Sequence, residues 1–255
     1  MQATDGASMS QHASPSTLVP PFGGAHDQLA AELAWLGHRL RVVVERSRDR
    51  RAGGPPADLR GMYVTDEEVE RLLQGDGVAG DTLEDELGRS RELRASADAR
   101  SAATQANGFQ PPFEQLASEF SLTPEERQIL VIALAASVDL AYEKIYAYVN
   151  DDVGKKRPTV GLVLEILADT PEQAVAFRPL LFEDSSLVRH HLISVSEDGS
   201  SFLSHYVDIS GHVAERLLGY QGIDPLLDGF VRPAAPCDQI PEMAGQLGCA
   251  LRAGT

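Results

Sequence analysis

The strongest constraint in this sequence is a helix start, Leu-Thr-Pro-Glu-Glu, that precedes a long run of apolar residues. Thr123 is placed to cap a helix, Pro124 suits its first position because proline has no N–H to leave unbonded, and Glu126 completes a capping box. Apolar residues then recur every three or four positions, which predicts one continuous helix from Pro124 to about Val149. A helix this apolar must be covered by other elements, so it should be the best-buried part of the core.

Further helices are expected on both sides of this one, because apolar residues recur there at helical spacing. The segment from Asp81 to about Ala106 lacks a strong apolar stripe, so it is either an exposed helix or a partly helical linker. The other helices are expected over residues 27–51, from Thr65 onward, and over residues 113–120, 160–167, 171–181, 186–190 and 211–218.

A β-hairpin is expected after these helices. Two runs with alternating apolar residues, Leu192–Ser196 and Phe202–Ile209, flank a turn that contains Asp198 and Gly199. An Asp-Gly pair between two such runs is typical of a tight hairpin turn. Helices, a hairpin and one more helix are the layout of a winged-helix domain, so the expected fold class is mainly α with a small β-hairpin, an α+β arrangement.

These patterns divide the chain into four parts. Residues 1–26 are rich in Ser, Ala, Pro and Gly and should form a disordered tail, because they bury too little apolar surface to offset the entropy of ordering. Residues 27–108 are expected to form a helical N-terminal region and residues 109–229 a winged-helix-like domain. Proline, glycine and alanine return in residues 230–255, which should be a linker or tail.

Charge and composition exclude several classes of function. The 255 residues contain 22 Lys and Arg against 38 Asp and Glu, a formal net charge of −16, so the phosphate backbone of a nucleic acid would repel much of the surface. No apolar stretch reaches the ~20 residues that a membrane-spanning helix needs. We therefore expect a cytoplasmic protein with no nucleic-acid partner, no membrane partner and no cofactor.

No catalytic motif is visible. The sequence lacks the phosphate-binding pattern G-x-x-x-x-G-K-[ST], the pattern H-E-x-x-H and the pattern G-x-S-x-G, so we expect no enzyme activity from this chain. A metal-dependent hydrolase is an open alternative, supported only by closeness in the sequence. Its ligands would come from Asp151, Asp152, His190, His191, His205 and His212.

An arginine-rich segment at the end of the first helix has two interpretations. Cations are favoured at a helix C-terminus by the helix dipole, so these side chains can simply be solvated. They could also contact phosphates or an acidic partner. The residues are Arg39, Arg41, Arg46, Arg48, Arg50 and Arg51.

The loop from Asn150 to Arg157 is the candidate partner-binding site. It places charges of both signs beside two tyrosines, and aromatic and arginine side chains are enriched at protein interfaces. The competing interpretation is that the loop only caps one helix and starts the next, because Asn and Asp favour turns. The candidate residues are Tyr146, Tyr148, Asn150, Asp151, Asp152, Lys155, Lys156 and Arg157.

The same region carries a family resemblance, which extends from about Phe113 to Gly229. The carrying segments are Phe120-Ser-Leu-Thr-Pro-Glu-Glu-Arg, Tyr142-Glu-Lys-Ile-Tyr-Ala-Tyr-Val-Asn-Asp-Asp152 and Arg157-Pro-Thr-Val-Gly-Leu-Val-Leu164. They resemble the helical and winged-helix region that precedes the ATPase core in a group of bacterial AAA+ ATPases, often encoded with contractile injection systems. The Tyr-x-Tyr-x-Asn-Asp-Asp to Arg-Pro-Thr block is the most specific part.

The resemblance implies a non-catalytic regulatory or recognition module that docks a protein partner or its own ATPase core. It implies an oligomer only where the module is attached to an ATPase ring. The family's phosphate-binding loop and magnesium-binding acidic strand are missing from this sequence, so no ATPase residue carries over. The chain is either the N-terminal part of a longer protein that binds ATP or a stand-alone derivative.

A DNA-binding winged-helix regulator is the main alternative function, since the expected hairpin and short helix supply its shape. Between Arg178 and Arg216, however, only three arginines accompany six acidic residues. A protein that reads a DNA groove would be positive there. A protein partner is therefore favoured over nucleic acid.

Overall fold

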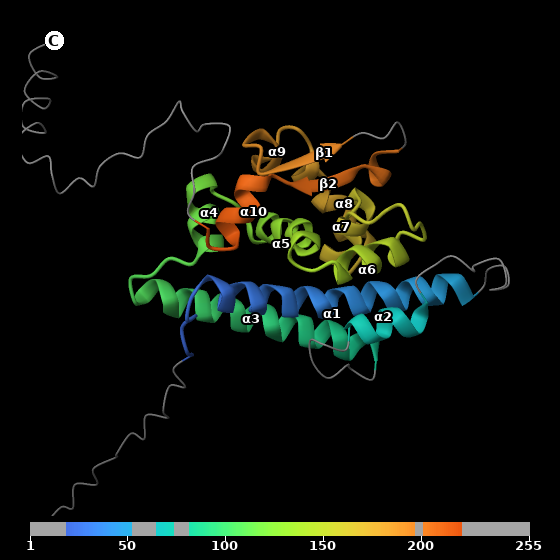
Figure 1. The fold of residues 1–255 in the computed structure, drawn as a ribbon, viewed down its shortest axis with the longest axis horizontal. Coiled ribbons are helices and arrows are strands. Elements are labelled where there is room, and N and C mark those ends of the chain that lie inside the picture. The colour runs from blue at the N-terminus through green and yellow to red at the C-terminus, as the bar shows by residue number, and fades with distance from the viewer. Residues whose placement is uncertain (1–18, 53–64, 74–81, 197–200, 221–255) are drawn as a thin grey trace, which may run out of the picture. The chain divides into compact units, whose positions relative to one another are not determined.

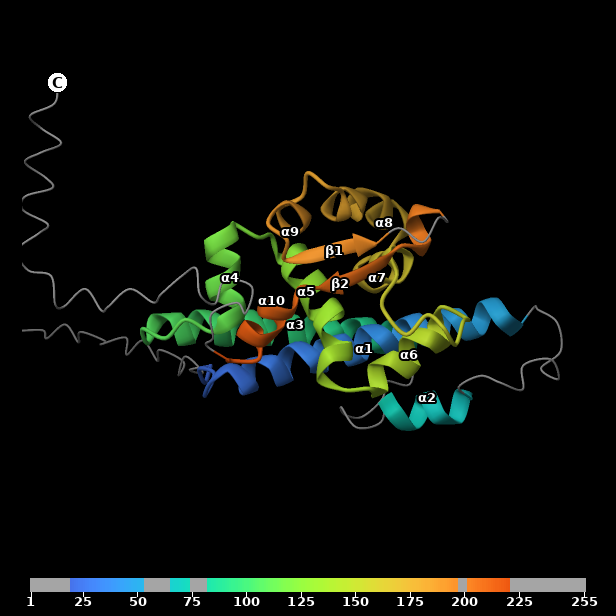
Figure 2. The same cartoon turned by 45° about the horizontal axis from the view of Figure 1, so that its top comes forward.

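Two long helices form one layer of the structure, and the other elements pack against them. The computed structural model describes residues 19–52, 65–73, 82–196 and 201–220. Helices α1 (Ala25–Ala52) and α3 (Leu83–Ala106) lie side by side, and the short helix α2 (Asp66–Leu73) lies near the C-terminal part of α1 (Figures 1 and 2).

A second group of helices and a hairpin complete the fold. Helices α5 and α7 lie between the α1/α3 pair and the hairpin (Figure 1). Strands β1 (Ile193–Ser196) and β2 (Tyr206–Ile209) are antiparallel, with Ile193 opposite Ile209. The predicted class, mainly α with a small β-hairpin, is confirmed. The remaining elements are α4 (Pro112–Phe120), α5 (Pro124–Val138), α6 (Ala141–Val149), α7 (Val160–Leu167), α8 (Pro171–Phe177), α9 (Ser186–Arg189), α10 (Gly211–Leu217) and the 3₁₀ turns η3 (Arg178–Leu181) and η4 (Phe202–Ser204).

Helix α5 occupies the centre of the core, as the sequence predicts. Its capping box is complete: Thr123 Oγ1 accepts a hydrogen bond from the Glu126 N–H at 3.2 Å, and Glu126 Oε2 accepts one from the Thr123 N–H at 2.9 Å. Every residue from Ile129 to Ala135 is buried, so α5 is covered on all sides rather than on one face. An element covered all round must be apolar all round, which explains the unbroken apolar run.

The continuous helix predicted from Pro124 to Val149 is wrong, because the segment forms two helices. Helix α5 ends at Val138, and Asp139 has an extended backbone with φ −143° and ψ 128°. Asp139 Oδ1 accepts a hydrogen bond from the Ala141 N–H at 2.8 Å, which satisfies a free donor at the start of α6. Asp side chains compete with helical hydrogen bonds in this way, and here the competition breaks the helix.

Helix α3 is helical from Leu83 to Ala106, so the predicted alternative of a partly helical linker is wrong. One face of this helix is exposed, as the other alternative expected, but the opposite face is buried. It packs along α1, and most of its buried side chains are small or polar, among them Ser90, Ala97 and Ser101. Small side chains let two helix backbones lie close together. Polar pairs join the same two helices, for example His38 Nδ1 with Glu86 Oε2 at 2.5 Å.

One hydrophobic core joins the N-terminal helices to the rest of the described chain. Leu36 and Leu40 of α1 belong to the same buried cluster as Leu134 of α5 and Val207 of β2. The core therefore runs through both sides of the boundary predicted near Gly108. Gly108 itself follows the end of α3 with φ +82°, a conformation that favours glycine.

The described chain begins before the predicted end of the N-terminal tail. Phe22 is buried, its N–H donates to Thr104 Oγ1 at 2.7 Å, and the Arg100 guanidinium lies 4.2 Å from the centre of its ring. Most of the predicted tail, the hairpin turn at residues 197–200 and the predicted C-terminal linker lie outside the described residues.

The first and last described helices meet. Gly219 follows α10 with φ +89°, and a Cβ atom at this position would lie 3.2 Å from the Ala25 Cβ at the start of α1. Both the left-handed backbone and the close approach favour glycine at this position.

Leu134→Asp should lower the free energy of unfolding by about 3 kcal/mol or more, because Leu134 is fully buried and an aspartate there would be an unpaired charge in the core. The measurement is urea unfolding followed by circular dichroism. Leu140→Asp is the control: Leu140 is 69% exposed, so its effect should stay within about 0.5 kcal/mol. Equal midpoints for the two variants would contradict the assignment of α5 to the core.

Candidate functional site

Helices α7 and α8 form a helix-turn-helix with a three-residue turn, residues 168–170. Thr159 caps α7 by accepting from the Leu162 N–H at 3.2 Å, and Thr170 is placed in the same way before α8. Thr159 also forms an antiparallel bridge with Tyr206 of β2, which attaches the hairpin to the start of α7. In DNA-binding proteins of this design the second helix of the motif enters the major groove, so α8 is the element to compare with a recognition helix. The short elements η3 and α9 lie between α8 and β1.

The exposed surface of α8 is not basic. Its sequence, Pro-Glu-Gln-Ala-Val-Ala-Phe, contains no Lys or Arg. Glu172 is exposed, and Val175 is 66% exposed. The first cation after the helix, Arg178, lies 5.6 Å from the centre of the Phe202 ring. A helix that enters a DNA groove must approach phosphates, and this surface offers an acid and an apolar side chain instead.

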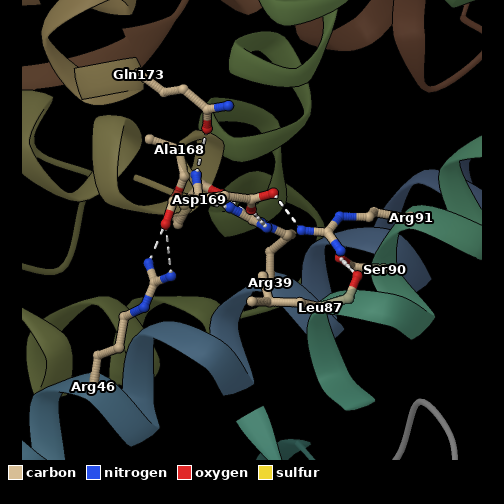
Figure 3. A network of polar contacts seen from close by, with 9 residues as sticks. Arg39, Arg46, Leu87, Ser90, Arg91, Ala168, Asp169 and Gln173 are labelled. Atoms are coloured by element: carbon tan, nitrogen blue, oxygen red, sulfur yellow. Dashed lines mark hydrogen bonds and ion pairs between the residues drawn. The ribbon is translucent and has the colours of Figure 1, made fainter. Parts of the chain in front are cut away.

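Arginines from the N-terminal helices bind the turn between α7 and α8 (Figure 3). Arg39 of α1 is only 4% exposed. Its guanidinium donates to the carbonyl oxygens of Ile166 at 2.5 Å and Ala168 at 3.1 Å, and pairs with Asp169 Oδ1 at 2.6 Å. Carbonyls at the end of a helix have no partner within it and carry partial negative charge, so a guanidinium stabilises them.

Two further arginines complete this group, which we call the turn network: Arg39, Arg46, Arg91 and Asp169. Arg46 of α1 donates to the Asp169 carbonyl at 3.3 Å, and Arg91 of α3 pairs with Asp169 Oδ2 at 2.8 Å (Figure 3). Burial raises the pKa of the Asp169 carboxyl, but hydrogen bonds from Arg91 and Arg39 outweigh burial and hold that pKa below its usual value.

The arginine-rich end of α1 is therefore occupied by contacts within the chain, which neither interpretation from the sequence describes. Arg41 is buried and donates to the Leu73 carbonyl of α2. Arg48 pairs with Glu70 of α2 at 3.2 Å. Arg50 pairs with Glu165 of α7 at 2.7 Å. The side chain of Arg51 lies outside the described residues.

The two tyrosines of the predicted partner site belong to the core, which corrects that prediction. Tyr146 is fully buried, its hydroxyl donates to the Ile132 carbonyl at 2.8 Å, and burial raises its pKa. Tyr148 is 6% exposed, and its hydroxyl donates to Asp66 of α2. Both side chains hold α6 in place and present no surface to a partner.

The other predicted site residues form a closed loop. Asn150 accepts from Thr159 Oγ1 at 2.9 Å and donates to the Lys155 carbonyl at 3.3 Å, so it joins both ends of the loop. Arg157 pairs with Asp208 at 2.7 Å, which attaches the loop to β2. Asp151, Asp152 and Lys156 are exposed. That they contact a partner remains a prediction.

Two of the histidines named in the metal hypothesis contact different aromatic side chains. The His190 ring lies 5.1 Å from the Phe120 ring, and the His205 ring lies 5.7 Å from the Phe202 ring. Within the part of the chain that the structure describes, no three His, Cys, Asp or Glu side chains are grouped to hold a metal ion. Among the same residues, no helix combines the length and apolar character needed to cross a membrane.

A helix-turn-helix, a two-stranded hairpin beside it and a bridge from the hairpin to the start of the first helix define a winged-helix protein. The family model of a variant winged helix domain matches residues 11–230, and the chain belongs to this family. The match includes α1, α2 and α3 as well as the helix-turn-helix. No curated protein and no solved structure gives a significant match.

Arg39→Ala should lower the free energy of unfolding by roughly 2–3 kcal/mol, because it leaves buried carbonyls and the Asp169 carboxylate without their main donor. Urea unfolding at pH 7 measures this loss. Arg89→Ala is the control, since the Arg89 side chain is 56% exposed and the loss should be about 0.5 kcal/mol or less.

The loss should also depend on pH. The pKa of Asp169 is lowered in the folded chain, so its pairing stabilises the fold above its unfolded pKa of about 3.9 and is lost as the pH falls through the lower folded value. The difference in the free energy of unfolding between the unmodified chain and Arg39→Ala should therefore become smaller below about pH 4. A difference that stays constant down to pH 2 would contradict the pairing.

Proposed function

We propose that this winged-helix chain is a non-catalytic regulatory or recognition module of an AAA+ ATPase, and that it docks either a protein partner or the ATPase core itself. A winged helix domain is a DNA-binding or protein-interaction module. The observation that favours a protein partner over DNA is the surface of α8, which has no Lys or Arg and exposes Val175. Exposed apolar side chains without cations suit a protein surface better than a phosphate backbone.

The link to AAA+ ATPases, including those encoded with contractile injection systems, is supported by the sequence block from Tyr146 to Thr159. The structure gives each part of this block a role. Tyr146 and Tyr148 fix α6, Asn150 joins the loop to Thr159, and Arg157 lies 4.3 Å from the centre of the Tyr206 ring on β2.

The chain contains no phosphate-binding loop sequence, so catalysis is assigned to a separate ATPase core. The proposed role is therefore to recognise a partner and to position it for that core. Protein docking is also consistent with the net charge of −16, which disfavours binding to polyanions.

A DNA-binding function predicts that the purified chain retards a duplex in an electrophoretic shift assay at low salt. We expect no shift of a 30-base-pair duplex at up to about 10 μM chain, because α8 supplies no cations for phosphates. The double variant Glu172→Lys, Gln173→Lys is the matched control, since it adds cations on the same exposed surface. A salt-sensitive shift with the unmodified chain would support the DNA-binding alternative.

The chain alone should neither bind nor hydrolyse ATP, because nothing in its sequence cradles a triphosphate. Calorimetric titration with ATP and magnesium checks this, and a micromolar dissociation constant would contradict it. The AAA+ assignment further requires a phosphate-binding loop, encoded either in the same reading frame or in a neighbouring gene. The ATPase so identified should elute with this chain in size-exclusion chromatography, and separate elution would contradict the proposed docking.

A further inference from the structure

A groove of about 490 Å³ lies beside α8, between the end of α1, α7 and the turn η4. We call it the α8 groove. Leu164 and Ala174 contribute to its apolar lining, and Val175 and Leu203 stand at its exposed side. Gly161 lets η4 approach α7, since a Cβ atom there would lie 3.1 Å from the Leu203 carbonyl oxygen. The groove is thus built into the contact between the helix-turn-helix and the hairpin.

The exposed side of the α8 groove is apolar. Val175 is 66% exposed, and Leu203 and Phe182 are each 45% exposed. The Phe182 and Phe202 rings lie 5.4 Å apart, so apolar surface continues from the groove onto η3 and η4. Large apolar side chains gathered in this way mark binding surfaces more often than isolated ones do.

The groove is also a locally positive place on an acidic chain. Arg46, Arg50 and Arg178 line it, against two carboxylates, Glu165 and Asp169. Arg50 is paired with Glu165 at 2.7 Å, so Arg46 and Arg178 carry the positive charge that remains. The Asp169 carboxylate is already paired with Arg39 and Arg91, so it does not cancel the lining arginines.

Arg178 has unused hydrogen-bonding capacity. Its guanidinium lies over the Phe202 ring, and it makes no hydrogen bond or ion pair with any residue in the described ranges. Arg46 is held only by long hydrogen bonds, 3.5 Å to the Ala168 carbonyl and 3.3 Å to the Asp169 carbonyl. A guanidinium supplies five donors in a planar fork that matches a carboxylate, so both side chains can donate hydrogen bonds to an acidic ligand.

We propose that the α8 groove binds a segment of a partner protein in which acidic residues flank a large apolar side chain. The apolar side chain covers Val175 and Leu203, and a carboxylate pairs with Arg178. The acidic character of the partner segment follows from charge complementarity. An acidic segment pairs with the Arg178 guanidinium, whereas a basic segment leaves it unpaired. This inference rests on the proposed protein-docking function and names the chemistry of the partner.

The test uses an array of synthetic peptides of about 12 residues, in which Leu or Phe is combined with Asp and Glu at every spacing. Two matched arrays replace the acids by Asn and Gln, or by Lys. The fluorescently labelled full chain should bind peptides of the acidic array only. Arg178→Glu and Val175→Asp should each weaken binding by roughly tenfold or more, because each removes one half of the proposed contact.

Arg89→Glu is the matched control, since it reverses an exposed charge on α3, whose position is outside the groove. It should bind the acidic array as the unmodified chain does. All three variants should keep the unmodified melting temperature, since Val175 and Arg178 make few contacts within the fold.

Three outcomes would overturn the proposal: no binding to the acidic array, equal binding to the neutral array, or binding that both groove variants leave unchanged. Failure here leaves the proposed function standing if the chain still elutes with its ATPase and retards no DNA. A DNA shift would instead remove the protein-docking function on which the inference rests.

Discussion

The position of the helix-turn-helix depends on one buried cation. Arg39 comes from the N-terminal helix α1 and binds the carbonyl end of α7 together with Asp169, so the two helical groups are joined by charge as well as by apolar packing. Ending a helix against another element leaves carbonyls without partners, and burying them unpaired costs free energy. Because the turn network satisfies those carbonyls, α8 can begin in a fixed orientation after a turn of three residues.

Short-range signals in the sequence predicted much of the fold. The cap at Thr123 is confirmed, because the cap and its partner Glu126 lie three residues apart and the chemistry is local. Asp139 carried a helix break that the apolar pattern on either side concealed. Helix α3 was not recognised as a packed helix, because its contact with α1 uses small and polar side chains such as Ser101 rather than an apolar stripe.

The site was less predictable for a physical reason. Arg39 and Asp169 are separated by 130 positions, so the sequence showed an arginine-rich helix end but not the carbonyls and carboxylate that receive those arginines. Tyr146 of α6 was assigned to a surface because aromatic residues favour interfaces, yet the same property favours a core. Only the three-dimensional arrangement separates the two.

The close approach of Gly219 to Ala25 brings the end of α10 to the start of α1, far along α1 from the α8 groove. The start of α1 and the residue that follows α10 therefore lie side by side. Arg46, which lines the α8 groove, lies near the other end of the same helix, and a rise of 1.5 Å per residue places it about 30 Å away. Helix α1 therefore keeps the place where it meets α10 about a helix length from the α8 groove.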